Sequence, residues 1–321
     1  LCDAVVGGSG QQTMEYLESA NLFVISLDNK RQWYRYHHLF SDVLQAHLMK
    51  EQPEVIPGLH RRASAWYEEN GFTADAVDHA FAAQDVERAA RIIELAWAEM
   101  DRSRQSATWL NWAKKLPDER IHIRPVLCLG LAWSCLDTGE LEAADSWLWR
   151  AEQCLEKTAD FVIADEVEFR FLPGSTAAAR TYLALALGDM PATVTHAQQA
   201  LDFFPEEEYL RRGTPGALLG LAYWAEGNVA KAQHAFAEAM TSYQKAGNIL
   251  FVITGAYVLA DMTLARGHLR EAVKICEDAL QLAQKHDGVV IRGAADLYTG
   301  LSEMFLEQNN LDAAKAYLQQ S

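Results

Sequence analysis

A short phrase recurs along the second half of the chain, and it restricts the fold more than any other feature of the sequence. Each copy opens with Gly or Asn, continues with a polar and an apolar residue, and closes five positions later in Ala or Thr. A period of this size is typical of stacked units that bury their apolar faces only against their neighbours. The copies start at Gly139, Gly188, Gly227, Gly267 and Asn309, at intervals of 39 to 49 residues.

Each position of the phrase has a physical role in a helical hairpin. The opening Gly or Asn suits a left-handed residue just past a helix end, and the polar residue after it can cap the next helix. Small residues also recur seven positions before the opening residue and twelve positions after it, which predicts two helices that approach closely. Those before it are Ala132, Thr181, Gly220, Ala260 and Ser302, and those after it are Ala151, Ala200, Ala239 and Ala279.

This pattern resembles the tetratricopeptide repeat over residues 124–321. The standard repeat has about 34 residues, so the longer period implies longer helices or longer connections. We therefore expect an all-α fold with a tetratricopeptide-like superhelix at 124–321. Residues 51–123 predict connecting hairpins, one built from 59–70 and 74–83 around Gly71, the other from 86–98 and 105–116 before Pro117. An inserted segment at 161–172 is predicted to end at Pro173-Gly174.

The first fifty residues follow a different pattern. Residues 11–20 predict a helix, and two β-prone runs at 22–27 and 32–36 flank a turn at 28–31, which predicts a hairpin. A second helix follows, whose apolar face holds Leu39, Phe40, Val43, Leu44 and Leu48. Helix, hairpin and helix form the end of a winged-helix domain, with the hairpin as its wing. We therefore assign residues 1–50 to the C-terminal part of such a domain.

The octapeptide at 33–40, Trp-Tyr-Arg-Tyr-His-His-Leu-Phe, is followed by the repeats. This combination resembles the MalT-like family of large ATP-dependent regulators, which are LuxR-type transcriptional activators of the signal-transduction ATPase class. The resemblance covers the whole chain. It implies a nucleotide-binding domain before the winged helix and a helix-turn-helix domain after the repeats. Because the chain begins at Leu1 and ends inside an amphipathic pattern, we expect it to be part of a longer protein.

The family's nucleotide chemistry is expected outside this chain. No G-x-x-x-x-G-K-[ST] motif occurs, and the Gly-rich run at 7–10 lacks the required Lys, so ATP or ADP is expected only in the longer protein. The resemblance implies that a winged-helix His reaches the nucleotide phosphates, which makes His37 and His38 the candidates for nucleotide sensing. The alternative is that each is only a helix cap or a packed ring.

In tetratricopeptide proteins the first helix of each pair lines a concave groove. Counting back from each opening residue predicts a groove that is aromatic in the middle and acidic at its C-terminal end. Aromatic faces stack on sugars or apolar ligands, and carboxylates accept hydrogen bonds from hydroxyls or amines. The alternative is that the aromatic residues only pack between helices. The predicted ligand-binding residues are Trp133, Tyr182, Trp224, Tyr257, Asp261, Asp296 and Glu303.

Arg180 stands where the other copies of the repeat have Leu. Either it is a buried pairing residue or the register slips locally, and the cost of an unpaired buried charge favours the slip. Glu166, Glu168 and Arg170 alternate in a way that is typical of a solvated face.

The composition disfavours several other classes of function. The net charge of −16, with only short basic pairs, disfavours nucleic-acid binding by this chain, so DNA contact is expected only through the absent C-terminal domain. No apolar run is long enough to span a membrane, and a cytoplasmic location is expected. The five Cys are scattered, which predicts buried thiols and no disulfide framework. His79, His196 and His234 lack ligand spacing, and we expect neither a metal site nor an enzyme.

These observations predict the signal-sensing part of a MalT-like activator. A small-molecule inducer, with a sugar as one candidate, would bind in the repeat groove and favour self-association. The alternative is a tetratricopeptide scaffold whose groove holds a peptide or a partner protein.

Overall fold

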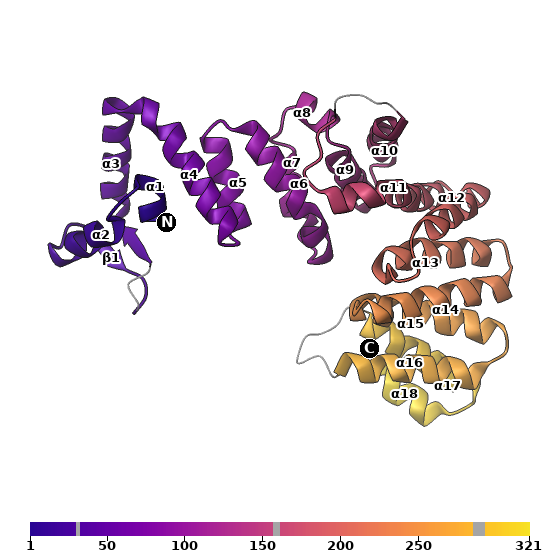
Figure 1. Ribbon diagram of the computed structural model, residues 1–321. Coiled ribbons are helices and arrows are strands. Elements are labelled where there is room, and N and C mark those ends of the chain that lie inside the picture. The colour runs from indigo at the N-terminus through magenta and orange to yellow at the C-terminus, as the bar shows by residue number, and fades with distance from the viewer. Residues whose placement is uncertain (30–32, 157–160, 285–292) are drawn as a thin grey trace. The chain divides into compact units, whose positions relative to one another are not determined.

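The computed structural model describes residues 1–29, 33–156, 161–284 and 293–321 (Figure 1). Within these ranges the chain forms α-helices and one antiparallel sheet of two strands, which confirms the all-α class and its single hairpin. The middle of the predicted hairpin, residues 30–32, lies outside the described residues. No helix of the described ranges has the length and apolar character to cross a membrane.

The chain divides into two compact units. The first comprises residues 1–127 with 161–165, and the second comprises 128–160 with 166–321. The boundaries at 50 and 123 that we drew from the sequence stay predictions.

The first unit begins with the predicted helix, hairpin and helix. Its elements are α1 (Cys2–Val6), α2 (Gly10–Ser19), β1 (Val24–Ser26), β2 (Tyr34–Tyr36) and α3 (His38–Glu51). Val24 pairs with Tyr36 in the sheet, and the Tyr36 hydroxyl lies 3.4 Å from the Met14 sulfur of α2, so one face of the wing packs on that helix. The apolar face predicted for α3 is not buried: Leu39, Val43 and Leu44 are exposed.

Two helical hairpins and a short helix complete the first unit. A 3-10 turn (Pro53–Val55) leads into α4 (Ile56–Glu69) and α5 (Thr73–Ala82), which are followed by α6 (Val86–Arg102), α7 (Ser106–Ala113) and α8 (Asp118–His122). Gly71 has a φ of +79° between α4 and α5, so the predicted hairpin turns on the residue expected. The Ser64 hydroxyl donates to the Ala76 carbonyl at 2.7 Å, and the buried Trp109 indole donates to the Ile93 carbonyl at 2.8 Å.

The second unit is built from antiparallel helix pairs, visible from magenta to yellow in Figure 1. The opening Gly residues of the phrase have φ values of +77° to +81° and Asn309 has +56°, as a left-handed helix end requires. Asp189, Asn228 and Asn310 each cap the following helix. The pairs are α9 (Pro125–Thr138) with α10 (Leu141–Glu156), α11 (Glu166–Ala186) with α12 (Met190–Phe203), α13 (Tyr209–Ala225) with α14 (Val229–Lys245), α15 (Ile249–Ala265) with α16 (Leu269–Gln284), and α17 (Ala294–Glu307) with α18 (Leu311–Leu318).

The small residues of the repeat lie where the helices meet. Every one of the positions predicted from the offsets is buried, from Ala132 and Thr181, both fully buried, to Ser302 at 9% exposure. The space that a larger side chain would need is taken by the neighbouring helix. The tetratricopeptide-like register of 124–321 is therefore confirmed along the described part of the second unit.

The predicted helix break at Pro173-Gly174 is wrong, because both residues lie inside α11. The Thr176 hydroxyl donates to the carbonyls of Leu172 and Pro173 at 2.9 Å each. A Cβ on Gly174 would lie 2.6 Å from the Phe203 ring, so the glycine admits the end of α12. Close packing against α12 outweighs the local tendency of Pro and Gly to end a helix.

Two charged residues are placed differently from the prediction. The register does not slip at Arg180, because its neighbour Thr181 is fully buried as the repeat requires; Arg180 instead pairs with Glu152 of α10. Glu168 is also not on a solvated face. It is buried and accepts two bonds from Arg211 of α13, at 2.9 and 2.6 Å. In both cases the oppositely charged partner offsets the cost of burying a charge. That cost was the reason for predicting a register slip at Arg180.

The burial of the cysteine side chains is only partly as predicted. Cys128, Cys135 and Cys276 are buried, while Cys154 is half-buried and Cys2 is exposed. Cys2 lies on α1, whose described residues are not buried, so the expectation of buried thiols is wrong for this position.

Candidate functional site

The predicted groove residues all lie on the first helices of the pairs. Trp133 is on α9, Tyr182 on α11, Trp224 on α13, Tyr257 and Asp261 on α15, and Asp296 and Glu303 on α17. The four aromatic residues are half-buried, and the three acidic residues are exposed.

Trp133 and Tyr182 lie against each other. Their ring centroids are 6.1 Å apart with a 74° angle between the ring planes. Both rings also pack on a core cluster that contains Leu129, Leu148 and Leu183. Edge-to-face packing of this kind stabilises the contact between α9 and α11. Part of each ring therefore has the packing role that was the alternative to ligand binding.

Trp224 belongs to a different core cluster. It packs with Phe236, Met240 and Met262 between α13, α14 and α15. Its ring is half-buried.

Tyr257 and Asp261 lie on α15, and Asp296 and Glu303 lie on α17, which packs against α15. The Tyr257 ring lies on Gly300, where an added Cβ would be 2.9 Å from a ring carbon. Burial raises the pKa of the Tyr257 hydroxyl, and the negative charges of Asp261, Glu303 and Asp296 raise that pKa further. A neutral hydroxyl among exposed carboxylates can donate and accept hydrogen bonds, and the carboxylates attract cations. We call these four residues the Tyr257 cluster.

His37 and His38 are exposed, and their rings stack with centroids 4.4 Å apart. His37 precedes α3, and its side chain makes no capping hydrogen bond. Its backbone N–H donates to the Phe23 carbonyl at 2.8 Å. The His37 and Phe23 rings lie edge-on to each other, with their centroids 6.5 Å apart. Phe23 itself has a φ of +60°, a strained conformation for a bulky residue. The role of the two histidines in nucleotide sensing stays a prediction.

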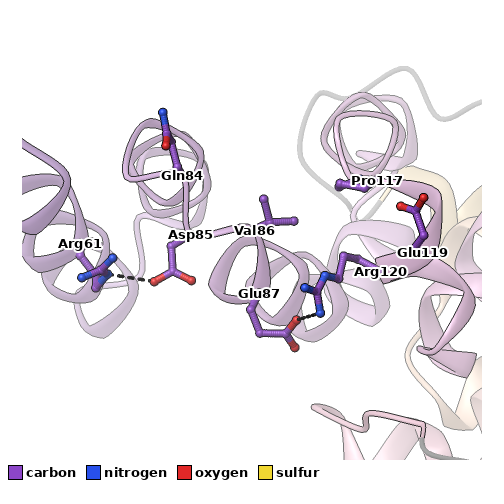
Figure 2. A pocket seen from close by; sticks show the side chains of 8 residues that line it. All are labelled: Arg61, Gln84, Asp85, Val86, Glu87, Pro117, Glu119 and Arg120. Atoms are coloured by element: carbon purple, nitrogen blue, oxygen red, sulfur yellow. Dashed lines mark hydrogen bonds and ion pairs between the residues drawn. The ribbon is translucent and has the colours of Figure 1, made fainter.

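Two open hollows on the surface do not include the predicted residues. One, of about 720 Å³, lies in the first unit at the start of α6. Figure 2 shows that Arg61 points to Asp85 there, while Arg120 points to Glu87. These ion pairs neutralise the arginines, so the hollow offers no free cation for an anionic ligand. The other, of about 700 Å³, lies beside the α15–α16 turn and includes His268, Arg270 and Gln308.

Two side-chain clusters of the first unit were missed by sequence reasoning. Glu94 and Arg124 form a buried ion pair at 2.7 Å. His60 of α4 and His79 of α5 face each other with their Nδ1 atoms 2.7 Å apart. The only signal for the histidine pair is that the two residues lie on opposite arms of one hairpin, His60 about three turns before Gly71 and His79 about two turns after it. Over the described ranges, no group of three or more His, Cys, Asp and Glu side chains is arranged to hold a metal ion.

Comparisons with protein families agree with this organisation. A model described as the MalT winged helix domain matches residues 1–56, and one described as the MalT-like TPR region matches residues 174–321.

Among curated relatives, the HTH-type transcriptional regulator MalT of Serratia proteamaculans is 27% identical over 278 residues, which is 86% of this chain and 30% of that protein. Serine/threonine-protein kinase PknK of Mycobacterium tuberculosis is 34% identical over 160 residues, which is 47% of this chain and 14% of that protein. The chain therefore spans less than a third of the length of these two relatives.

Among solved structures, a Signal Transduction ATPase with Numerous Domains (STAND) protein with a tetratricopeptide repeat sensor, from Pyrococcus horikoshii, has a TM-score of 0.65. The identity is 14%, and the match covers 99% of this chain and 52% of that chain. Because the identity is low, this likeness shows the fold alone. The two family models lead to one conclusion: the chain is MalT-like, with a MalT winged helix domain followed by a MalT-like TPR region.

Proposed function

We propose that this chain is the signal-sensing part of a LuxR-type transcription regulator, and that a small-molecule inducer binds on the first helices of its repeat region. The observation that carries the proposal is the Tyr257 cluster. Two of its residues lie on α15 and two on α17, and the negative charges of the three acidic residues raise the pKa of the Tyr257 hydroxyl. MalT-type domains in the order winged helix and repeat region support the regulatory setting.

The chemistry of the cluster suggests the class of inducer. Exposed carboxylates accept hydrogen bonds from hydroxyl or amine groups, and the partly exposed Tyr257 ring offers a stacking face. A polyhydroxylated or amine-bearing molecule fits this combination, and a sugar is one candidate. The half-buried Trp133, Tyr182 and Trp224 would extend the binding surface toward the N-terminal repeats.

Inducer binding would act by differential affinity for two states. If the ligand binds a self-associating form more tightly than the resting form, the population shifts toward self-association. In the longer protein, ATP or ADP would bind the preceding domain, and a following helix-turn-helix domain would contact DNA in the cytoplasm. This chain would contribute sensing and no catalysis.

A thermal-shift screen tests the inducer proposal. A ligand at about 100 times its Kd adds roughly 2.7 kcal/mol, enough to raise the Tm by a few degrees. We expect a small-molecule hit whose shift is lost in Asp261→Asn and retained in Asp278→Asn, an exposed Asp on α16. Trp224→Ala should weaken the shift, and Trp149→Ala, which removes an exposed ring from α10, should not. A hit that responds equally to the members of each pair would place the site elsewhere.

The scaffold function is a second candidate, and the acidity of the Tyr257 cluster favours it specifically. An acidic surface prefers a basic peptide through complementary charge. Peptides belong in the same screen for this reason. Stabilisation by basic peptides alone, lost at 0.5 M salt, would support the scaffold and contradict the inducer proposal.

The nucleotide-sensing role of His37 and His38 is tested in the longer protein. Each is changed to Ala, and nucleotide affinity and basal activation of transcription are measured. We expect one of the two changes to weaken nucleotide binding and raise basal activity. If both variants behave like the unchanged protein, the two histidines have no such role.

A further inference from the structure

A continuous line of aromatic rings runs through the first unit, from the wing to the hairpin of α4 and α5. Trp33 of the wing meets Phe72 edge-on, with centroids 5.7 Å apart. Phe72 stacks on Trp66 at 6.2 Å and meets the edge of Tyr67 at 6.0 Å. Tyr67 in turn stacks on His79 at 5.3 Å with only 16° between the rings. The wing is therefore linked by ring contacts to a histidine on α5.

The line ends in the histidine pair. The Nδ1 atoms of His60 and His79 are 2.7 Å apart, which is a short N–H···N hydrogen bond. Such a bond needs one Nδ1 to carry a proton and the other to be bare. A first added proton is compatible with it, because a charged ring can still donate to a neutral one. A second added proton puts two N–H groups face to face and destroys the bond.

We propose that His60 and His79 form a proton-controlled catch, which holds α4, α5 and the Trp33–Phe72 contact in place while at most one ring is protonated and releases them when both are. The catch would make the attachment of the wing to the first hairpin depend on acidity. It does not rest on inducer binding, because none of its residues belongs to the Tyr257 cluster.

The surroundings of the pair support a release at acid pH. Burial lowers the pKa of His79, and the neighbouring His60 lowers it as well. Asp75 and Asp78 of α5 act in the opposite direction on that pKa but do not cancel the shift. Asp78 also forms an ion pair with Lys115, which follows α7 in the chain; the Lys115 Nζ lies 3.7 Å from the Asp78 carboxylate.

Several other charged groups of the packed elements have partners of their own. On α4, Glu68 holds Arg88 and Arg91 of α6. Arg61 pairs with Asp85, and Arg62 donates to the Val5 carbonyl of α1. Titratable Cys2 of α1 is close enough to raise the pKa of Tyr67.

The sign of the linkage follows from the direction of the shift. A histidine whose pKa is lower in the folded state favours folding most above its ordinary pKa of about 6.5, where the ring is neutral in both states. This stabilisation is lost as the pH falls from there to the folded pKa. Opening should therefore become about tenfold more favourable for each unit by which the pKa of His79 is lowered.

Hydrogen exchange of this 321-residue chain at pH 7.5 and pH 5.0 tests the proposal. After correction for intrinsic rates, we expect faster exchange at pH 5.0 in α5 and in β1 and β2. The variant His79→Gln, which cannot be protonated, should lose this pH dependence. The matched variant His47→Gln removes an exposed histidine of α3 and should keep it.

Ring titration by NMR gives a second readout, which in the unchanged chain does not depend on any variant folding. One ring of the pair should remain neutral well below pH 6.5 in the unchanged chain, and His60→Gln should raise the pKa of His79. Independent titration of the two rings near pH 6.5 would overturn the proposal. So would a pH dependence of wing exchange that persists unchanged in a folded His79→Gln variant.

Discussion

Arg180 of α11 and Glu152 of α10 form a two-bond ion pair, in which Nε and Nη2 of the guanidinium donate to the two carboxylate oxygens at 2.8 Å each. The remaining guanidinium nitrogen, Nη1, donates a hydrogen bond to Asp145, which lies on α10 like Glu152. The hydrogen bonds that Arg180 makes with Glu152 raise the pKa of its guanidinium above the ordinary value. The pair occupies a position that Leu131, Leu219 and Leu301 fill with apolar side chains in other repeats.

Two substitutions of Arg180 should therefore differ in their effect on stability. Arg180→Ala removes the pairing and leaves a gap, and we expect it to cost about 1–3 kcal/mol of stability. Arg180→Leu restores the side chain of the other repeats, and Glu152 and Asp145 are exposed enough to be hydrated. We expect it to change stability by less than about 1 kcal/mol. Midpoints of thermal unfolding check both, and an equal loss in the two variants would contradict the explanation.

Arg180 also shows where sequence reasoning reached its limit. The repeat offsets predicted the register of the helices, because small residues are required wherever two backbones approach and that requirement is local in sequence. Ion pairing is not local in this way. Glu152 lies 28 positions before Arg180, on the opposite side of an inserted segment, and no spacing rule connects them. The same reason hid Glu168 with Arg211, and His60 with His79.

The candidate site was predictable only in part. The offsets placed Tyr257 and Asp261 on one helix, and Asp296 and Glu303 on another, and how near they lie depends on the packing of α15 against α17. The degree of burial of Trp133 and Tyr182 was not predictable, because it depends on how closely α9 and α11 pack. The exposed face of α3 was missed for a different reason: periodicity shows which side chains share a face but not what covers that face.

The stability of the first unit should be especially sensitive to substitutions in the buried pair of Glu94 and Arg124. Their side chains are 0% and 2% exposed. Glu94 also accepts the backbone N–H groups of Ala164 and Asp165, at 2.8 and 3.2 Å. Glu94→Gln leaves the buried Arg124 paired with the half-exposed Glu87, which is a weaker partner, and we expect a loss of about 3 kcal/mol, with faster hydrogen exchange at residues 161–165.

A control for this change lies one turn along the same helix. Glu99 is 73% exposed and pairs with Arg102 at 2.8 Å, so Glu99→Gln should change stability by less than about 0.5 kcal/mol. Chemical denaturation of the two variants under identical conditions measures the difference. A loss in Glu94→Gln no larger than in Glu99→Gln would show that the buried pair does not stabilise the unit.

The free thiols should differ sharply in reactivity. Burial raises the pKa of Cys276 to about 12, and its side chain is fully buried, so almost none of it is a thiolate at pH 8. Cys2 is exposed. We expect iodoacetamide to label Cys2 in the native chain within minutes and to label Cys276 only after denaturation. Mass spectrometry of tryptic peptides checks this, and native labelling of Cys276 would mean that α16 opens readily.

Two glycines inside helices should respond differently to the same substitution. An added Cβ on Gly220 of α13 would lie 3.0 Å from the backbone nitrogen of Phe236 and 3.1 Å from the Ala232 carbonyl oxygen. These are atoms of α14 that cannot rotate away, so Gly220→Ala should cost about 1–3 kcal/mol despite the better helix propensity of Ala.

Gly255 of α15 is the matched comparison, because its added Cβ would meet chiefly the end of the flexible Met240 side chain. Met240 can adopt another rotamer, and Ala gains about 1 kcal/mol of helix propensity over Gly. Gly255→Ala should therefore be close to neutral or slightly stabilising. Thermal midpoints of the two variants decide the matter. If both are equally destabilised, rigid backbone contact is not what requires glycine at Gly220, and the contact between α13 and α14 must be looser than the distances indicate.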